Sequence, residues 1–323
     1  MTEIKAQIKI VVTGCAGFIG SNLVDFLLST GQIVIGLDNL STGNIENLEE
    51  ALTQKNFYFH EVDLYESNNL DSYFQNTDMV FHFAANADVR YGAEHPKKDL
   101  EQNVLVTHNV LEAMRKNNVL KIIFSSTGSV YGEAPVIPTP EESFFPIQTS
   151  LYGASKIAAE SLIEAYCETF RMQAWIFRFV SILGPRYSHG HVYDFYAQLK
   201  SDPSYLKVLG NGYQKKSYLH VEDCIKAIDL ALRNSNDKIN IFNLGIDAVC
   251  EVRDSIKWIC HFLSVNPNID FGSTSKGWIG DNPHIHLDIS KIQKLGWEPT
   301  KTIEQGVRDT VSYLQKNEWL FKK

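Results

Sequence analysis

Residues 8–20 read Ile8-Lys9-Ile10-Val11-Val12-Thr13-Gly14-Cys15-Ala16-Gly17-Phe18-Ile19-Gly20, a short β-branched run that leads into three evenly spaced glycines. A helical pattern follows over residues 21–30. Glycines allow a tight turn and a close backbone approach, and a helix N-terminus offers N–H groups to a pyrophosphate. This order of strand, turn and helix predicts a dinucleotide-binding unit, with contacts from Gly14, Gly17, Phe18, Ile19 and Gly20.

The run Ile33–Asp38 predicts a second buried strand, which ends on a carboxylate eighteen residues beyond Gly20. A carboxylate at this place accepts hydrogen bonds from the 2′- and 3′-hydroxyls of a ribose. It also repels a 2′-phosphate, and no arginine stands within several residues to bind one. The sequence therefore favours NAD over NADP as the cofactor.

Strand-like and helix-like segments alternate as far as residue 180, which predicts parallel strands in one sheet with helices on both faces. We therefore expect an α/β fold with a doubly wound parallel sheet of the Rossmann type. Further strands are expected at 57–62, 79–83, 121–125 and 173–180, and long helices at 103–116 and 151–170.

After residue 180 glycine, proline and aromatic residues interrupt shorter segments, although Ile239–Leu244 can still add a strand to the sheet. The expected division is an NAD-binding Rossmann domain over 1–180, to which 219–246 return, and a smaller, interrupted α/β substrate-binding domain over 181–218 and 247–323. Ligands bind at the carboxyl edge of such a sheet, so the smaller domain should cap that edge.

Tyr152 and Lys156 lie four residues apart, on one face of the predicted helix 151–170. A phenol has a pKa of about 10. A cation one turn away, together with the positive nicotinamide ring, would lower that pKa and make the tyrosine a usable base. Ser125-Ser126-Thr127 ends the fifth strand, so a hydroxyl from this group can complete a proton-handling trio.

Several motifs follow one another along the chain, and in them it resembles the extended short-chain dehydrogenase/reductases of the UDP-glucose 4-epimerase type. The resemblance extends over residues 8–315. The motifs are Gly-x-x-Gly-x-x-Gly, Asp38-Asn39-Leu40-Ser41-Thr42-Gly43, Asp63-Leu64, His82-Phe83-Ala84-Ala85, Ser125-Ser126-Thr127, Tyr152-x-x-x-Lys156, Tyr218-Leu219-His220 and Leu295-Gly296-Trp297.

This resemblance implies cofactor roles that the spacing alone does not assign. Asp63 and Leu64 would flank the adenine, Asn103 would support the site from its helix, and Val180 would lie near the nicotinamide. The implied contacts beyond the glycine turn and Asp38 are Asn39, Ser41, Thr42, Gly43, Asp63, Leu64, Phe83, Ala84, Ala85, Asn103, Ser125, Tyr152, Lys156 and Val180.

The resemblance also implies the reaction, with Tyr152, Lys156 and Thr127 as the catalytic residues. Tyr152 would remove the proton of the sugar 4-hydroxyl while C4 is oxidised, and Thr127 would hydrogen-bond the sugar. The transient 4-keto sugar would turn over in the pocket and be reduced on its other face. The expected function is thus the NAD-dependent epimerisation of a nucleotide sugar, a UDP-hexose, at C4.

Other functions stay open at this point. Nucleotide-sugar 4,6-dehydratases start with the same C4 oxidation but follow the active-site threonine with an Asp-Glu pair, where this chain has Gly128-Ser129. Related decarboxylases and reductases are further alternatives. A non-catalytic NAD-binding sensor would be expected to lose Tyr152 or Lys156, and both are present.

The substrate half departs from the family pattern where the sugar diphosphate should be held. Ser181 stands where the family commonly has an asparagine, and Lys216 stands where it has an arginine. A second arginine, expected shortly before Gly280-Asp281, is missing from the sequence, and Lys276 is the only cation near that place. Lysine neutralises phosphate without the bidentate fork of arginine. The implied substrate contacts are Thr127, Tyr152, Ser181, Lys216, Asp88, Arg90, Arg186 and Lys276.

Composition excludes several partners. The net charge of −8 argues against a nucleic-acid or membrane-surface binder, and no apolar run approaches the roughly 20 residues that cross a bilayer. The five cysteines are scattered without a Cys-x-x-Cys pair, so no metal site or disulfide framework is expected. The absence of a signal-like start favours the cytoplasm. The resemblance implies a homodimer formed by the helices 103–116 and 151–170.

Overall fold

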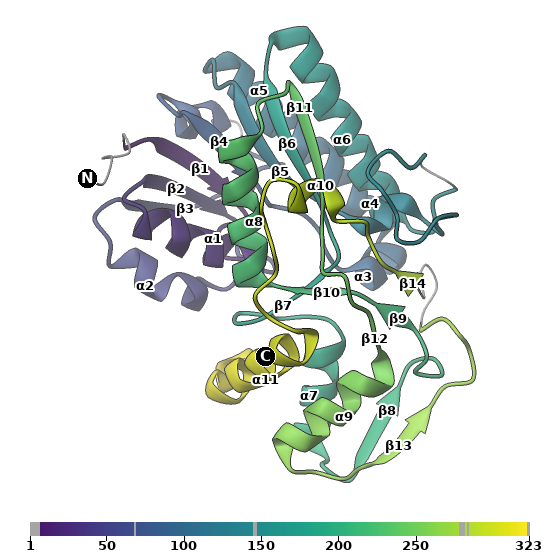
Figure 1. The fold of residues 1–323 in the computed structure, drawn as a ribbon. Coiled ribbons are helices and arrows are strands. Elements are labelled where there is room, and N and C mark those ends of the chain that lie inside the picture. Colours follow the sequence, from purple (N-terminus) through teal and green to yellow (C-terminus); the bar gives the residue numbers. More distant parts are fainter. Residues whose placement is uncertain (1–6, 68, 145–146, 278–281, 283, 322–323) are drawn as a thin grey trace.

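The computed structural model describes residues 7–67, 69–144, 147–277, 282 and 284–321. Its centre is a parallel sheet of seven strands, which confirms the expected doubly wound fold (Figure 1). The strands are β1 (Lys9–Thr13), β2 (Ile33–Asp38), β3 (Phe57–Glu61), β4 (Met79–His82), β5 (Lys121–Thr127), β6 (Gln173–Phe179) and β11 (Ile239–Leu244). Their spatial order is β11-β6-β5-β4-β1-β2-β3, so Ile239–Leu244 does join the sheet, beside β6.

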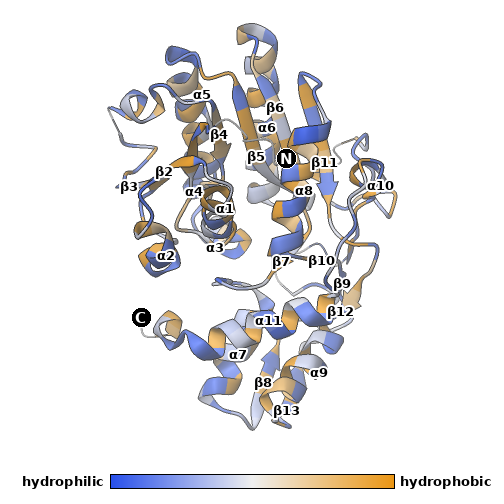
Figure 2. Ribbon diagram, turned by 60° about the vertical axis from the view of Figure 1, so that its left-hand side comes forward, coloured by the Kyte–Doolittle hydropathy of each residue, from blue (hydrophilic) through white to orange (hydrophobic). Residues whose placement is uncertain are grey.

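Both faces of the sheet are buried because successive strand residues point to opposite sides. In β1, Ile10 and Val12 enter one core cluster and Val11 enters the other. The first cluster includes apolar residues of α1 (Phe18–Ser29) and α8 (Val221–Asn234). The second includes those of α5 (Val106–Lys116) and α6 (Leu151–Phe170). In Figure 2 hydrophobic residues mark the strands, whereas hydrophilic and hydrophobic residues alternate along α8.

Shorter helical segments connect these elements. They are η1 (Ile45–Leu48), α2 (Glu49–Leu52), η2 (Leu70–Phe74), α3 (Val89–Glu94), α4 (Pro96–Asp99), η3 (Leu100–Leu105) and η4 (Gly128–Tyr131). The predicted helix 103–116 therefore begins inside η3, which is a π-helix, and continues as α5. Within the described ranges, no helix is both long and apolar enough to cross a membrane.

A second lobe lies beside the carboxyl edge of the sheet, below it in Figure 1. It holds three small groups of paired strands: β7 with β10, β8 with β13, and β9 with β12 and β14. The bounds of its elements are β7 (Ser181–Leu183), α7 (His191–Ser201), β8 (Tyr205–Val208), β9 (Lys215–Lys216), β10 (Tyr218–His220), β12 (Cys250–Glu251), α9 (Val252–Leu263), β13 (Asn268–Phe271), β14 (His284–Ile285), α11 (Ile303–Lys316) and η5 (Glu318–Phe321). The short helix α10 (Ser290–Gln293) lies instead beside β11 of the main sheet (Figure 1).

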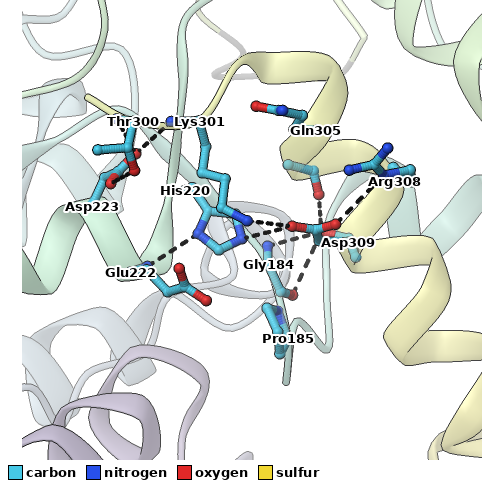
Figure 3. Close-up of polar contacts among 12 residues, drawn as sticks. Gly184, Pro185, His220, Glu222, Asp223, Thr300, Lys301, Gln305, Arg308 and Asp309 are labelled. Atoms are coloured by element: carbon cyan, nitrogen blue, oxygen red, sulfur yellow. Dashed lines mark hydrogen bonds and ion pairs between the residues drawn. The ribbon is translucent and has the colours of Figure 1, made fainter.

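Polar contacts fix α11 to the strands that leave the sheet (Figure 3). His220, at the end of β10, places Nε2 3.6 Å from Oδ2 of Asp309 on α11, and Lys301 donates to the same carboxylate at 3.1 Å. Thr310 accepts a hydrogen bond from the backbone N–H of Gly184 at 2.8 Å. Asp223 of α8 accepts from the backbone N–H of Lys301 at 2.9 Å. These contacts hold the second lobe against the sheet at one end of the cleft described next.

Candidate active site

A cleft of about 1010 Å³ follows the carboxyl edge of the sheet and is closed on its far side by the second lobe. Most of the residues predicted from the sequence line it. From the Rossmann side these are Gly14, Gly17, Phe18, Ile19, Gly20, Asp38, Asn39, Ser41, Thr42, Gly43, Leu64, Phe83, Ala84, Ala85, Asp88, Arg90, Ser125, Thr127, Tyr152, Lys156 and Val180, and from the facing side Ser181 and Lys216.

The glycine turn has no room for side chains. Gly14 has a φ of +69°, and a Cβ there would lie 2.6 Å from the backbone nitrogen of Ala84. A Cβ on Gly20 would lie 2.0 Å from the carbonyl oxygen of Gly14. Among the described residues, no side chain caps the N-terminus of α1, so its first N–H groups face the cleft with the positive end of the helix dipole. The turn thus fits a pyrophosphate.

Asp38 is fixed at the end of β2 by two backbone contacts. Its Oδ2 accepts from the N–H of Ala16 and its Oδ1 from the N–H of Leu40, both at 2.9 Å. Burial raises the pKa of this carboxyl, and these hydrogen bonds oppose the shift. Each oxygen keeps a further lone pair for a ribose hydroxyl. The acid and the glycine turn together fit a dinucleotide whose ribose carries no 2′-phosphate.

Tyr152, Lys156 and Thr127 meet where β5 ends against α6. Ser150 begins the helix by accepting a hydrogen bond from the N–H of Gly153 at 3.0 Å, which sets Tyr152 in the first turn. The Tyr152 phenol is hydrogen-bonded to the Thr127 side chain. The ammonium of Lys156 lies 4.3 Å from the centre of the Phe124 ring. The three predicted side chains therefore form one group at the cleft.

The electrostatics of this group differ from the sequence-based expectation. Burial raises the pKa of Tyr152 to about 12, and the hydrogen bond with Thr127 opposes that rise. Burial also lowers the pKa of Lys156 to about 7, against the pull of Glu160. Among the protein's own groups burial therefore dominates both pKa values, and the lowering expected for Tyr152 beside the positive nicotinamide stays a prediction. The physical reason is that desolvation disfavours both charged forms.

A buried ion pair lies directly behind the catalytic group and was not predicted from the sequence. Glu160 of α6 accepts hydrogen bonds from Ser126 of β5 and from Arg178 of β6, with Arg178 Nη2 2.7 Å from Glu160 Oε2. Arg178 also donates to the Tyr131 hydroxyl at 2.8 Å. The network ties the helix that carries Tyr152 to the strand that carries Thr127. Tyr152, Lys156 and Glu160 follow one another at intervals of four residues, and this helical spacing is the signal that could have revealed the position of Glu160.

Two predicted cofactor residues lie behind the lining. Asp63 accepts from Asn39 Nδ2 at 2.9 Å and so orients a side chain that does line the cleft. Asn103 is 1% exposed; its Oδ1 accepts from the N–H of Asn86 at 2.9 Å and its Nδ2 donates to Ser155 Oγ at 2.8 Å. Asn103 is thus placed to support the cleft wall, and the adenine contact of Asp63 stays a prediction.

Two predicted substrate cations are likewise absent from the lining. Arg186 Nη2 lies 2.6 Å from Asp25 Oδ2 on α1, and Lys276 Nζ lies 2.5 Å from Glu133 Oε1. Each cation is paired with a nearby carboxylate that sequence spacing does not reveal, and a contact of either cation with the substrate stays a prediction. Gly280-Asp281, near which a second arginine was expected, lies outside the described residues.

The facing wall is made by alternate residues of an extended segment and by the first turn of α7. Gln214, Lys216 and Tyr218 line the cleft, whereas Lys215 points to Glu251, with Nζ 3.9 Å from Oε1. His191 and Asp194 of α7 line it as well, and the sequence analysis missed them. The alternation from 214 to 218 was a usable signal. In the part of the chain that the structure describes, no group of three or more His, Cys, Asp or Glu residues could hold a metal ion.

Comparison with known proteins gives a consistent result. The model of the NAD dependent epimerase/dehydratase family matches residues 10–245. The UDP-glucose 4-epimerase of Mycolicibacterium smegmatis is 30% identical, over 95% of this chain and 98% of that protein. A crystal structure of UDP-galactose 4-epimerase is 36% identical, with a TM-score of 0.86 and coverage of 97% of this chain and 100% of that one. The UDP-glucuronic acid 4-epimerase from Bacillus cereus, in complex with UDP-glucuronic acid and NAD, has a TM-score of 0.88 at 27% identity, covering 96% and 99%.

Proposed function

The chain belongs to the NAD dependent epimerase/dehydratase family, and from this premise we propose that it interconverts the C4 epimers of a UDP-hexose. It is an NAD-dependent enzyme of the UDP-sugar 4-epimerase type. The observation that carries the proposal is the meeting of Tyr152, Thr127 and Lys156 in the same cleft as the glycine turn and Asp38. One cavity thus brings a proton-handling group to a dinucleotide site.

In the proposed reaction the protein handles the proton and orients the sugar. NAD, when bound, supplies the reversible oxidation at C4 of the sugar. Tyr152 takes the proton from the sugar 4-hydroxyl and returns one after the sugar has turned over. Thr127 holds that hydroxyl beside the phenol, and the cation of Lys156 stabilises the phenolate when the cleft is filled.

The second lobe is proposed to hold the nucleotide diphosphate. Ser181 and Lys216 line the cleft on this side, as does Lys207 of β8. Two lysines can balance the two charges of a diphosphate, although without arginine's planar fork. This arrangement supports a UDP-sugar with its sugar directed toward Tyr152.

The dehydratase alternative is less well supported by the cleft. Gly128-Ser129 follow Thr127, and neither side chain can act as the acid or base that eliminates water. Glu133 is the nearest later carboxylate in this segment, and it pairs with Lys276 outside the cleft lining. Epimerisation needs no such group, because the proton and the C4 hydrogen return to the same sugar.

The proposed function is tested by incubating the purified enzyme with UDP-glucose, UDP-galactose, their N-acetyl forms and UDP-glucuronate, without added cofactor. NMR should show equilibration of C4 epimers with no change in mass. Loss of water would instead identify a dehydratase, and loss of carbon dioxide a decarboxylase. If NAD stays bound and no sugar reacts, the proposal is wrong and a sensor role is supported.

A homodimer is also proposed, in which the outer faces of α5 and α6 from two copies form a four-helix bundle. Leu105 at the end of η3 and Leu151 and Phe170 of α6 are 36%, 47% and 39% exposed, which gives this face an apolar character. Light scattering during gel filtration should give about twice the mass of the chain. A monomer at micromolar concentration would contradict this proposal.

A further inference from the structure

An ion pair spans the cleft between its two sides. Arg90 belongs to α3 of the Rossmann lobe, and its Nη1 lies 3.2 Å from Oδ2 of Asp194, in the first turn of α7. On the same side as Arg90, Asp88 lies with Oδ1 3.9 Å from Arg90 Nε. All three residues line the cleft. We call Asp88, Arg90 and Asp194 the cross-cleft cluster.

The ion pairs of the cross-cleft cluster are too exposed to be explained by stability. The three side chains are between 36% and 41% exposed. Ion pairs of this exposure contribute little, about 0–1 kcal/mol, to folding. Asp88 also begins α3, because its Oδ1 accepts from the N–H of Arg90 at 2.9 Å. The cluster is therefore a fixed set of charges that faces whatever enters the cleft.

The cross-cleft cluster begins on a helix that neighbours the helix of Tyr152, and we therefore assign it to the sugar side of the cleft. Its helix α3 packs against α6, the helix that carries Tyr152. Asn86, just before α3, donates to Asp99, whose carboxylate acts electrostatically on Tyr152. Lys207 and Lys216, the cations proposed for the diphosphate, come instead from β8 and β9 of the second lobe.

The charges that line the cleft can be counted over the described residues. Its cations are Arg90, Lys156, Lys207 and Lys216, and its carboxylates are Asp38 at the cofactor end, Asp88 and Asp194. Lys156 serves Tyr152, and the two other lysines match the two charges of a diphosphate. Arg90 faces two carboxylates, so the cross-cleft cluster has a net charge of −1. Burial lowers the pKa of His189 and brings that of His191 to about 3, so these imidazoles add no cation at neutral pH.

We propose that the cross-cleft cluster makes the enzyme specific for UDP-sugars whose hexose is uncharged and excludes uronic acids. A uronate would bring a third negative charge to a cleft whose remaining guanidinium is already shared by Asp88 and Asp194. Like charges placed together at a binding site cost several kcal/mol and serve mainly to reject wrong ligands. A neutral hexose meets no such penalty, and its hydroxyls can donate to the aspartates. This inference rests on the proposed C4 epimerisation.

The test compares kcat/KM for UDP-glucose and for UDP-glucuronate, which share a nucleotide. The native enzyme should prefer UDP-glucose by about 100-fold or more, since 1.4 kcal/mol corresponds to tenfold. Asp88→Asn with Asp194→Asn releases Arg90 and should move this preference toward UDP-glucuronate by about 10-fold or more. Adding Arg90→Gln to that double variant should remove the gain. Asp194→Asn alone should give a smaller shift of the same sign.

Asp71→Asn is the matched control, because Asp71 forms a similarly exposed pair with Lys116, Nζ to Oδ2 3.0 Å, and does not line the cleft. This variant should leave the ratio of kcat/KM for UDP-glucose to that for UDP-glucuronate unchanged. The inference is overturned if the native enzyme uses both sugars equally or prefers the uronate, or if the ratio in the folded, NAD-retaining variants stays at the native value. Failure of the proposed function would look different: no UDP-sugar would be epimerised at all.

Discussion

The two walls of the cleft differ in which part of the chain forms their surface. On the cofactor side, the surface is backbone: Gly14 and Gly20 bring main chain together so closely that a Cβ has no space. On the substrate side, the surface consists of polar and charged side chains such as Asp194 and Lys216, carried by short elements. The fold fixes a wall made of backbone, whereas substitutions in a wall made of side chains can change which ligand binds without changing the fold. Substitutions should therefore affect turnover or binding most at the catalytic side chains and the backbone wall, and least at the side-chain wall.

The largest effect is expected at Tyr152, where the two walls meet. Tyr152→Phe removes the proton-handling oxygen but keeps the ring, so kcat should fall by about 10²–10⁴-fold, as for loss of a general base. NAD content and thermal unfolding should stay near native, because the cofactor wall is untouched. Steady-state kinetics and the absorbance of released NAD measure both. Native turnover in this variant would remove Tyr152 from the mechanism.

Gly14→Ala tests the backbone wall, with Gly31→Ala as its matched control. Both glycines have positive φ, +69° and +83°, but a Cβ on Gly31 meets no atom within 4 Å. Gly31→Ala should therefore lower the free energy of unfolding by only about 1 kcal/mol, because alanine is strained in the left-handed conformation. Gly14→Ala should in addition weaken NAD binding by about 100-fold or more, since every 1.4 kcal/mol is tenfold.

The two glycine variants are compared by calorimetric titration of NAD and by urea unfolding. Equal NAD affinity in both would show that steric exclusion at Gly14 does not shape the pyrophosphate site.

A smaller effect is expected at Asp38, an acidic side chain on the cofactor wall. Asp38→Asn keeps an acceptor for one backbone N–H but loses the charge that repels a 2′-phosphate. We expect the preference for NAD over NADP to narrow by about 10-fold, equivalent to about 1.4 kcal/mol. Competitive binding of the two dinucleotides measures it. An unchanged preference would assign the selection to another residue.

The smallest effect is expected on the substrate wall. Lys216→Arg supplies the bidentate fork that the lysine lacks, so KM for the UDP-sugar should fall by about 2–5-fold with kcat unchanged. Lys216→Met should raise KM instead. If neither variant changes KM, Lys216 is only a solvated residue at the edge of the cleft.

Much of the fold and the cofactor site could be predicted because the signals are local. The alternation of strands and helices predicted the sheet, and the ends of β2 and α6 were predicted to the residue. Gly14, Gly20 and Asp38 need no distant partner to be recognised, since a turn and a strand end define them. Helical spacing places Tyr152 and Lys156 on one face, but their roles were inferred from the family resemblance.

By itself, the sequence determined the parallel sheet and the glycine turn, because short-range periodicity and spacing encode them. The resemblance of its motifs to a known family supplied the proposed catalytic trio. Only the tertiary structure decided which charges act together. It paired Arg186 with Asp25 and Lys276 with Glu133, and it placed Arg90 against Asp194 across the cleft. It also decided that burial raises the pKa of Tyr152, because desolvation depends on everything packed around the phenol. Charge pairing and burial are properties of the assembled molecule, and no local pattern records them.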